Sequence, residues 1–331
     1  MNILITGSSG FIGKYLLKEL IAKGHKCRCL LRNTENIDPF FFDDNIELFK
    51  GDVTKPETLD SIGKNIDTVY HLAAAGHVAA GSEQAQKSFF DLNVQGTKNL
   101  IEACCKNDVK RFFHFSSTAS MGLPDNTVID ETVLCNPVTP YQKSKYQSEM
   151  MAFKTGKELG IEVIVLRPCM VYGPGGEGEF LKFGRLIKKG IFPRIGLGKN
   201  LTPIVHVEDV VQAAVNALEK ATPGEVYLIA SETSSKLSEI QKMICEALNI
   251  NRIYFYVPLW IAYLAGLFFE KISILNGKPP IVSRRNIIST SVDRTFDISK
   301  AKSDLGYNPS KILANEIKNT VEWYLKSKLI S

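Results

Sequence analysis

Hydrophobic residues in the first half of the chain fall into short runs separated by stretches with helical periodicity. The runs occupy residues 2–6, 27–31, 46–49, 68–72, 111–116 and 161–166. They are short and apolar, as buried strands are. Strands that alternate with helices in this way predict an α/β fold, here a Rossmann-type doubly wound parallel sheet.

The first strand-like run leads directly into a glycine-rich turn. Residues Gly7-Ser8-Ser9-Gly10-Phe11-Ile12-Gly13 are followed by 14–23, where apolar residues recur at helical spacing. Glycines allow a tight turn and let the backbone approach a pyrophosphate, and the helix N-terminus adds free N–H groups and the positive end of a dipole. The spacing is G-x-x-G-x-x-G, and its place between a strand and a helix predicts dinucleotide binding.

After about residue 172 the pattern loosens. Helical periodicity occurs at 179–189, 208–219, 237–248 and 311–327, and short strand-like runs occur near 204–206 and 225–229. We expect residues 1–172 to form the dinucleotide-binding Rossmann domain, with 204–230 returning to it, and 173–331 to form mainly a smaller substrate-binding part. The glycine-rich stretch 173–178 is expected to be a mobile loop near the site.

The residue that ends the second strand bears on the choice of cofactor. An acidic side chain about 20 residues past the glycines would accept the ribose 2′-hydroxyl of NAD. This chain has Arg32 there. Because a guanidinium suits a 2′-phosphate, we favour NADP over NAD, with stacking on the adenine or exposure to water as the alternative for Arg32.

Tyr141 and Lys145 are four residues apart, so on a helix they lie on one face, about one turn apart. An ammonium held near a phenol favours the phenolate, and Lys145 is therefore expected to lower the pKa of Tyr141. A tyrosine with a lowered pKa can act as a general acid and base near neutral pH. The motif alone is weak, because it arises often by chance in a lysine-rich protein.

Composition excludes several classes of function. The net charge is +5 and the basic residues are scattered, so no nucleic-acid surface is indicated. No metal site is expected. The cysteines show no C-x-x-C spacing and are interpreted as buried thiols of a protein in the reducing cytoplasm; they are Cys27, Cys29, Cys104, Cys105, Cys135, Cys169 and Cys245. The opening residues are interpreted as a strand in use for the fold, too short for a signal peptide.

Several motifs, in order along nearly the whole chain, resemble the extended short-chain dehydrogenase/reductase family, which includes nucleotide-sugar epimerases and 3β-hydroxysteroid dehydrogenases. The matching segments are Thr6–Gly13, Gly51-Asp52-Val53, Val69–Ala74, Asn93–Thr97, Phe115–Thr118, the Tyr141/Lys145 pair and Arg167–Pro174. The resemblance implies that Tyr141 is the general acid and base, that Lys145 holds the nicotinamide ribose, and that Thr118 contacts the same substrate oxygen. Ser117 is the alternative to Thr118, and Asn93 is expected to support the site.

The same resemblance and the glycine turn together give the expected cofactor contacts. They are Gly7, Ser9, Gly10, Phe11, Ile12, Gly13, Arg32, Asp52, Val53, Leu72, Ala73, Ala74, Ser116, Tyr141, Lys145, Pro168 and Val171. A homodimer is also expected, because family members commonly pair through two helices that correspond here to about 85–106 and 140–159.

Two segments bear on the substrate. In nucleotide-sugar enzymes an arginine usually grips the pyrophosphate within the segment corresponding to 196–207, and Thr202 stands in its place, with Arg185, Lys199 or Arg284 as possible substitutes. Residues 253–269 contain no charge and, with 277–280 and 292–298, resemble the C-terminal part of steroid-dehydrogenase-type members. This run of 17 residues is shorter than the roughly 20 that cross a bilayer. A buried helix is the preferred interpretation, ahead of an apolar lid over the substrate and a membrane-surface anchor.

These features predict an NAD(P)-dependent oxidoreductase that acts on a secondary alcohol or ketone by hydride transfer, of the 3β-hydroxysteroid dehydrogenase type. The alternative is a nucleotide-sugar 4-epimerase with retained NAD. A 4,6-dehydratase is discounted, because Ala119 and Ser120 stand where that reaction needs an acid pair. A sensor that binds dinucleotide without catalysis is a further, minor alternative.

Overall fold

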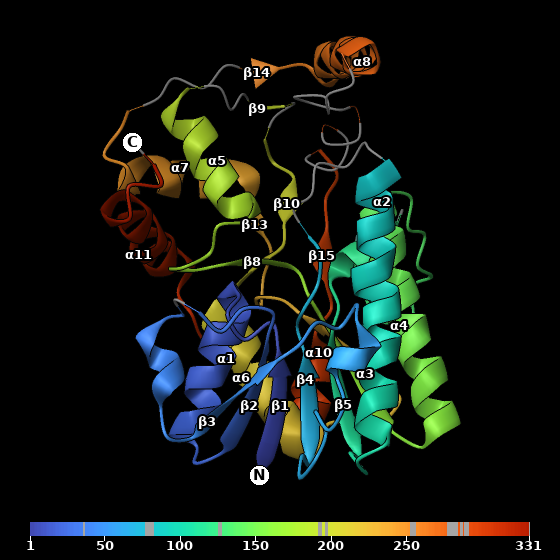
Figure 1. The fold of residues 1–331 in the computed structure, drawn as a ribbon. Coiled ribbons are helices and arrows are strands. Elements are labelled where there is room, and N and C mark those ends of the chain that lie inside the picture. The colour runs from blue at the N-terminus through green and yellow to red at the C-terminus, as the bar shows by residue number, and fades with distance from the viewer. Residues whose placement is uncertain are drawn as a thin grey trace.

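The computed structural model describes residues 1–35, 37–76, 83–124, 128–190, 194–195, 198–251, 256–276, 284, 287 and 291–330. Its centre is a seven-stranded parallel sheet in the order β3-β2-β1-β4-β5-β7-β12 (Figure 1). The strands are β1 (Asn2–Thr6), β2 (Lys26–Leu31), β3 (Ile46–Lys50), β4 (Thr68–His71), β5 (Arg111–Phe115), β7 (Glu162–Pro168) and β12 (Val226–Ile229). The predicted doubly wound α/β fold is confirmed, and the chain order reverses between β1 and β4.

Helices cover both faces of this sheet, so its strands are apolar on both sides. Along β1, Ile3 and Ile5 belong to one hydrophobic core and Leu4 to the other. One layer contains α1 and α6, and the other contains α3 and α4. The helices are α1 (Phe11–Ala22), α2 (Glu83–Phe89), α3 (Gly96–Cys105), α4 (Pro140–Leu159), α5 (Glu179–Lys188), α6 (Val207–Lys220), α7 (Leu237–Ala247), α8 (Leu259–Asn276), α10 (Ser299–Leu305) and α11 (Leu313–Lys326).

Short elements complete the described chain. The short helices are η1 (Pro39–Phe42), η2 (Pro56–Thr58), the π-helical turn η3 (Phe90–Gln95) and η4 (Thr118–Met121). The short strands are β6 (Val128–Ile129), β8 (Met170–Tyr172), β9 (Arg194–Ile195), β10 (Leu201–Thr202), β11 (Ile204–His206), β13 (Ser235–Lys236), β14 (Tyr256–Val257) and β15 (Thr295–Phe296). The helix expected over 85–106 is thus interrupted by η3, and a homodimer through this segment and α4 stays a proposal.

A third hydrophobic core lies beyond the carboxyl ends of the sheet strands. It joins α5, α7 and α11 through buried residues such as Phe180, Ile240 and Val321. Residues 204–230 contribute β12 to the edge of the main sheet and α6 to the layer beside α1. The division into a Rossmann domain and a substrate-binding part stays a proposal.

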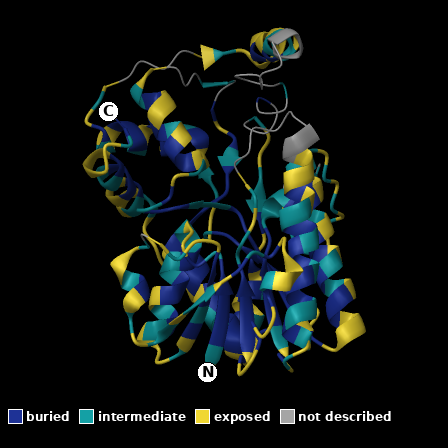
Figure 2. Cartoon of the chain, viewed as in Figure 1, coloured by how far each residue is buried: buried dark blue, intermediate teal, exposed yellow. Residues whose placement is uncertain are grey.

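The apolar segment 253–269 is not a buried helix, which corrects the preferred interpretation. Residues 253–255 lie outside the described residues, as do 277–280. The rest forms β14 and the first part of α8, whose Trp260 and Phe268 are 66% and 61% exposed. Figure 2 marks much of α8 as exposed, at the end of the molecule opposite the N-terminus. Within the described ranges, we find no helix with the length and apolarity that a membrane crossing requires.

Candidate active site

The glycine turn between β1 and α1 leaves no room for side chains at its bends. Gly7 has φ +71°, and a Cβ atom there would lie 2.8 Å from the backbone nitrogen of Ala73. At Gly13 a Cβ atom would lie 2.1 Å from the Gly7 carbonyl oxygen. The N-cap residue of α1, Gly10, has no side chain to satisfy the first N–H groups of the helix. These groups can therefore bind an anion such as a pyrophosphate.

Buried polar side chains join the ends of β1 and β4 beneath this turn. The hydroxyl of Thr6 lies 2.7 Å from His71 Nδ1 and accepts a hydrogen bond from the Ala73 backbone N–H. His71 Nε2 lies 3.0 Å from the Thr97 hydroxyl. Burial, aided by the charge of Lys145, lowers the pKa of His71 to about 3, so this imidazole is neutral. The network fixes Ala73 beside Gly7.

Helix α4 presents Tyr141 and Lys145 because its first turn is strongly specified. Thr139 is the N-cap, and its hydroxyl accepts a hydrogen bond from the Gln142 N–H while the Gln142 side chain accepts one from the Thr139 N–H. Pro140 occupies the first helical position, where its missing N–H costs nothing. Tyr141 and Lys145 then follow one turn apart, as the sequence predicted.

Lys145 is buried, and its ammonium donates a hydrogen bond to the Phe115 carbonyl at 2.8 Å. Burial lowers its pKa to about 8, and the carboxylate of Glu149 opposes this shift. Glu149 lies one turn further along α4, fully buried, and forms an ion pair with Arg167. The Ser116 hydroxyl donates a hydrogen bond to the same carboxylate. Lys145, Glu149 and Arg167 are therefore three buried charged residues close to one another on and beside α4.

The pKa of Tyr141 is raised, contrary to the expectation that Lys145 lowers it. Burial is the main cause and the negative charge of Glu179 adds to it, while a hydrogen bond with Ser117 acts in the opposite direction. The Lys145 ammonium is not among the groups that shift the pKa of Tyr141, and it donates a hydrogen bond to the Phe115 carbonyl. The phenol ring packs at 5.7 Å from that of Phe89.

Asn93 holds the segment after β4 to α4. Its side-chain oxygen accepts a hydrogen bond from the Ala75 N–H at 2.7 Å, and its side-chain nitrogen donates to the Ser144 hydroxyl at 2.9 Å. Ser144 in turn donates to the Tyr141 carbonyl. Asn93 is thus buried, and two successive hydrogen bonds, through the Ser144 hydroxyl, connect it to the Tyr141 backbone carbonyl.

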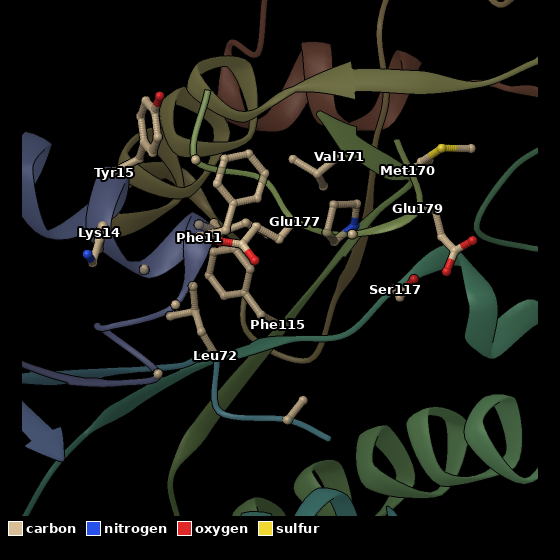
Figure 3. Close-up of a pocket in the computed structure, with 18 of the residues that line it drawn as sticks. Phe11, Lys14, Tyr15, Leu72, Phe115, Ser117, Met170, Val171, Glu177 and Glu179 are labelled. Atoms are coloured by element: carbon tan, nitrogen blue, oxygen red, sulfur yellow. The ribbon is translucent and has the colours of Figure 1, made fainter. Parts of the chain in front are cut away.

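A cavity of about 710 Å³ lies beyond the glycine turn, at the carboxyl ends of the sheet strands (Figure 3). Many of the predicted cofactor contacts line it: Gly7, Ser9, Gly10, Phe11, Ile12, Gly13, Leu72, Ala74, Ser116, Tyr141, Lys145, Pro168 and Val171. The open helix N-terminus, the close approach permitted by the glycines and this volume fit a dinucleotide.

Four predicted contacts do not line this cavity. Ala73 lies behind Gly7, where the Thr6 hydroxyl accepts its N–H. The Asp52 carboxylate accepts hydrogen bonds from the Thr54 N–H and hydroxyl, and Val53 is buried in the core against α3. Arg32 is exposed just after β2 and forms no ion pair with the described residues.

A second cavity, of about 480 Å³, adjoins the first. Tyr141, Ser117, Cys169, Met170 and Glu179 border both. The remaining lining residues are mostly polar or small: Gly76, Thr118, Ala119, Gly122, Leu123, Thr139, Gln142, Thr202, Pro203, Arg294 and Phe296. Thr118 therefore faces the second cavity only, whereas Ser117 contacts Tyr141.

Arg294 reaches this cavity through contacts that the sequence did not reveal. The Asp293 carboxylate accepts the Leu201 N–H at 2.7 Å, and the Arg294 N–H donates to the Leu201 carbonyl at 3.1 Å. This pairing places Arg294 beside Thr202. The suggested substitutes for the missing arginine do not line either cavity: Arg185 donates to the Leu329 carbonyl, Lys199 is exposed, and Arg284 pairs with Glu270.

Sequence reasoning also missed the residues that the loop after β8 brings in. Glu177 and Glu179 line the cofactor-sized cavity, and Figure 3 shows Glu177 near Phe11, and Glu179 near Ser117 at the other end. The glycine-rich stretch 173–178, expected to be mobile, is held by hydrogen bonds from two tyrosine hydroxyls, Tyr15 to the Pro174 carbonyl and Tyr324 to the Gly176 carbonyl. The glycine-rich stretch 173–178 was the feature of the sequence that could have pointed to Glu177 and Glu179 as residues of the site.

The cysteines and the other side chains that could bind metal form neither a metal site nor a disulfide among the described residues. In the part of the chain that the structure describes, no group of His, Cys, Asp and Glu is arranged to hold a metal ion. The seven cysteines form no disulfide with one another. Burial raises the pKa of several of these thiols, including that of Cys29 to about 11, which keeps them protonated.

Comparison with known proteins places this chain in a family. The sequence model of the NAD dependent epimerase/dehydratase family matches residues 3–230, and the chain belongs to this family. UDP-glucose 4-epimerase of Vibrio cholerae is 28% identical over 98% of this chain and 96% of its own length. A 3beta-hydroxysteroid-dehydrogenase/decarboxylase of Arabidopsis thaliana is 30% identical over 77% of this chain and 62% of its own. The structure of UDP-glucose 4-epimerase from Thermotoga maritima, 26% identical, superposes with a TM-score of 0.77 over 99% of this chain and all of that one.

The resemblance to extended short-chain dehydrogenases and reductases is thereby confirmed. The protein is an NAD-dependent enzyme, an oxidoreductase or an epimerase.

Proposed function

We propose that this enzyme is an epimerase that inverts a carbon bearing a secondary alcohol in a sugar joined to a diphosphate, with tightly held NAD. The observation that carries the proposal is the position of Tyr141, which borders both the cofactor-sized cavity and the second one. A substrate hydroxyl in the second cavity would meet the phenol at the wall that the two cavities share. Such a position suits a general acid and base.

The lining of the second cavity supports a polar substrate. Arg294 offers a planar guanidinium, which suits a diphosphate through forked hydrogen bonds, in a place close to Thr202. Thr139, Gln142 and Thr202 add groups that can bind sugar hydroxyls. An apolar steroid would leave these groups without partners, which is costly when water is excluded.

The proposed division of labour uses residues of α4 and of the end of β5. Tyr141 takes the proton of the substrate hydroxyl and later returns it, while Thr118 hydrogen-bonds the same oxygen and stabilises the charge that develops there. Lys145 would hold the nicotinamide ribose, and its positive charge would then favour the Tyr141 phenolate. NAD, when bound, supplies the hydride acceptor. Asn93 acts indirectly, by holding α4.

The choice between NAD and NADP depends on whether the site can bind the 2′-phosphate of NADP. Arg32 supports it, because its exposed guanidinium stands at the end of β2 and forms no ion pair within the described ranges. The family is NAD-dependent. We therefore propose NAD as the resident cofactor and Arg32 as the residue that would admit NADP.

A second candidate is net oxidation or reduction of an apolar secondary alcohol, as in the original expectation. The similarity to the Arabidopsis steroid dehydrogenase and the presence of Thr202 in place of an arginine favour it. A sensor without turnover is the third possibility, and it would bind NAD yet convert no substrate.

The experiment combines mass spectrometry of the protein as purified with an assay of UDP-glucose and UDP-N-acetylglucosamine interconversion with their 4-epimers, without added cofactor. We expect retained NAD and interconversion. Tyr141→Phe should lower kcat by at least about 100-fold and keep the NAD content, because only the proton transfer is lost. The matched control is Tyr146→Phe, five residues further along α4 and lining neither cavity, which should keep full turnover.

An enzyme without retained NAD that reduces a steroid ketone with NADPH would contradict the proposal and favour the second candidate. Normal turnover of Tyr141→Phe would contradict the role of the phenol in either case.

A further inference from the structure

We propose that α8 is a membrane-surface helix, which holds this enzyme against anionic lipid through its exposed apolar and aromatic face. The proposal is independent of the proposed function. Trp260, Leu264 and Phe268 recur every four residues and therefore form one face of α8. Their side chains are 66%, 54% and 61% exposed. Leu259 and Tyr263 extend this face and border a shallow apolar hollow with Trp260 and Leu264.

The opposite face of α8 is the one that packs on the protein. Ala262 is buried, and a Cβ atom at Gly266 would lie 2.8 Å from the Arg284 backbone nitrogen. Ile287 is buried next to Gly266. Because 262 and 266 point inward, 260, 264 and 268 point away from the protein. Among the described residues, no element covers the outer face, and Figures 1 and 2 show α8 at an extreme end of the molecule.

The basic residues near this face favour anionic lipid as its binding partner. Among the described residues near α8, three are basic, Arg194, Lys271 and Arg284, and one is acidic, Glu270, which forms an ion pair with Arg284. Arg194 lies 5.8 Å from the ring of Tyr256, and Arg284 lies 5.5 Å from that of Tyr263. Basic groups beside tryptophan and tyrosine at the edge of an apolar face are the pattern of a helix that lies in an anionic lipid interface. A dimer interface between identical copies would bring these like charges together.

The length of the helix agrees with a position on the bilayer. Its 18 residues extend about 27 Å, less than the roughly 30 Å of the hydrocarbon core. The helix would lie in the interface with its apolar face inserted, and the carboxyl ends of the sheet strands, where the cavities lie, face the same end of the molecule (Figure 1).

The test is sedimentation of the full chain with vesicles of phosphatidylcholine alone and of equimolar phosphatidylcholine and phosphatidylglycerol. We expect binding to the anionic vesicles, little to the neutral ones, and weakening at about 1 M salt, where the Debye length is about 3 Å. The triple variant W260S/L264S/F268S should lower the partition coefficient at least about tenfold. A matched control, F42S/L134S/I312S, removes three comparably exposed apolar side chains from other parts of the chain and should bind as the wild type does.

A second measurement does not depend on the folding of the triple variant. Trp260 and Trp323 are the two tryptophans. In a Trp323→Phe variant, the emission of Trp260 should shift to the blue on adding anionic vesicles. An unshifted emission, equal binding of the triple variant, or a dimer that the triple variant dissociates would overturn the proposal. Retained NAD in the triple variant separates its failure from that of the proposed function.

Discussion

At the end of β5, two adjacent hydroxyl groups have different surroundings. Ser117 forms a hydrogen bond with Tyr141 and borders both cavities, whereas Thr118 borders the second cavity only. The Ser117 side chain also accepts the Ala119 N–H at the start of η4. The family resemblance implied one catalytic hydroxyl, and these positions suggest two tasks. We propose that Ser117 acts on the phenol and that Thr118 acts on the substrate.

This separation predicts different kinetic effects for the two substitutions. Ser117→Ala removes the hydrogen bond that lowers the pKa of Tyr141, so the limb of the pH–rate profile that reports the phenolate should move to higher pH. Thr118→Ala should leave that limb in place and lower kcat by about 10²- to 10³-fold, as loss of one donor to a developing charge does. Profiles of kcat/KM against pH distinguish the two, and a shift in Thr118→Ala alone would contradict the assignment.

At the scale of elements, α11 supports the loop that closes one side of the cofactor-sized cavity. The Tyr324 hydroxyl donates to the Gly176 carbonyl at 2.7 Å, and Trp323 beside it lines the cavity. Tyr307 is a matched case elsewhere, because its buried hydroxyl donates to the Ala230 carbonyl at 2.8 Å. Neither Tyr307 nor Ala230 lines a cavity described above.

Tyr324→Phe and Tyr307→Phe should therefore lower the free energy of unfolding equally, each by about 1–3 kcal/mol, since each leaves a buried carbonyl without its donor. Only Tyr324→Phe should weaken NAD binding, by about fivefold for a bond worth about 1 kcal/mol. Urea unfolding and calorimetric titration of cofactor-stripped protein measure the two effects. Equal NAD affinity in both variants would show that α11 does not support the loop.

At the scale of the whole molecule, two buried histidines link stability to pH. His71 and His114 lie on neighbouring strands of the central sheet, and their pKa values are lowered by burial and by the charge of Lys145. In the unfolded chain each would have a pKa of about 6.5. The unfolded state therefore binds more protons than the folded state below about pH 6.5, and the free energy of unfolding falls as the pH falls.

For His71, whose folded pKa is about 3, the loss between pH 6.5 and 5 amounts to about 2 kcal/mol. We expect His114 to add to the loss in the same direction, because burial and the charge of Lys145 lower its pKa too. Urea unfolding at several pH values should show this slope, and a H71N/H114N variant should show a flatter one. An unchanged slope in the variant would mean that other groups control acid stability.

Much of the fold and part of the site follow from the sequence because they depend on local spacing. The strand-like runs, the glycine turn and the four-residue separation of Tyr141 and Lys145 are properties of neighbouring residues, and the periods of strands and helices fix which side chains share a face. The parallel sheet follows from the alternation of strands and helices. A chain with these spacings is bound to bring its glycine turn and the strand ends to one edge of the sheet.

The remaining features depend on segments that are distant in sequence. Burial and Glu179 raise the pKa of Tyr141, and Arg294 reaches Thr202 through a pairing across about ninety residues. The charge-free run 253–269 gives no sign of which side of α8 is covered. Desolvation and long-range charge are properties of the packed molecule, since each depends on what surrounds a group in space. The spacing of the motif was thus decided by the sequence, and its electrostatics by the tertiary structure.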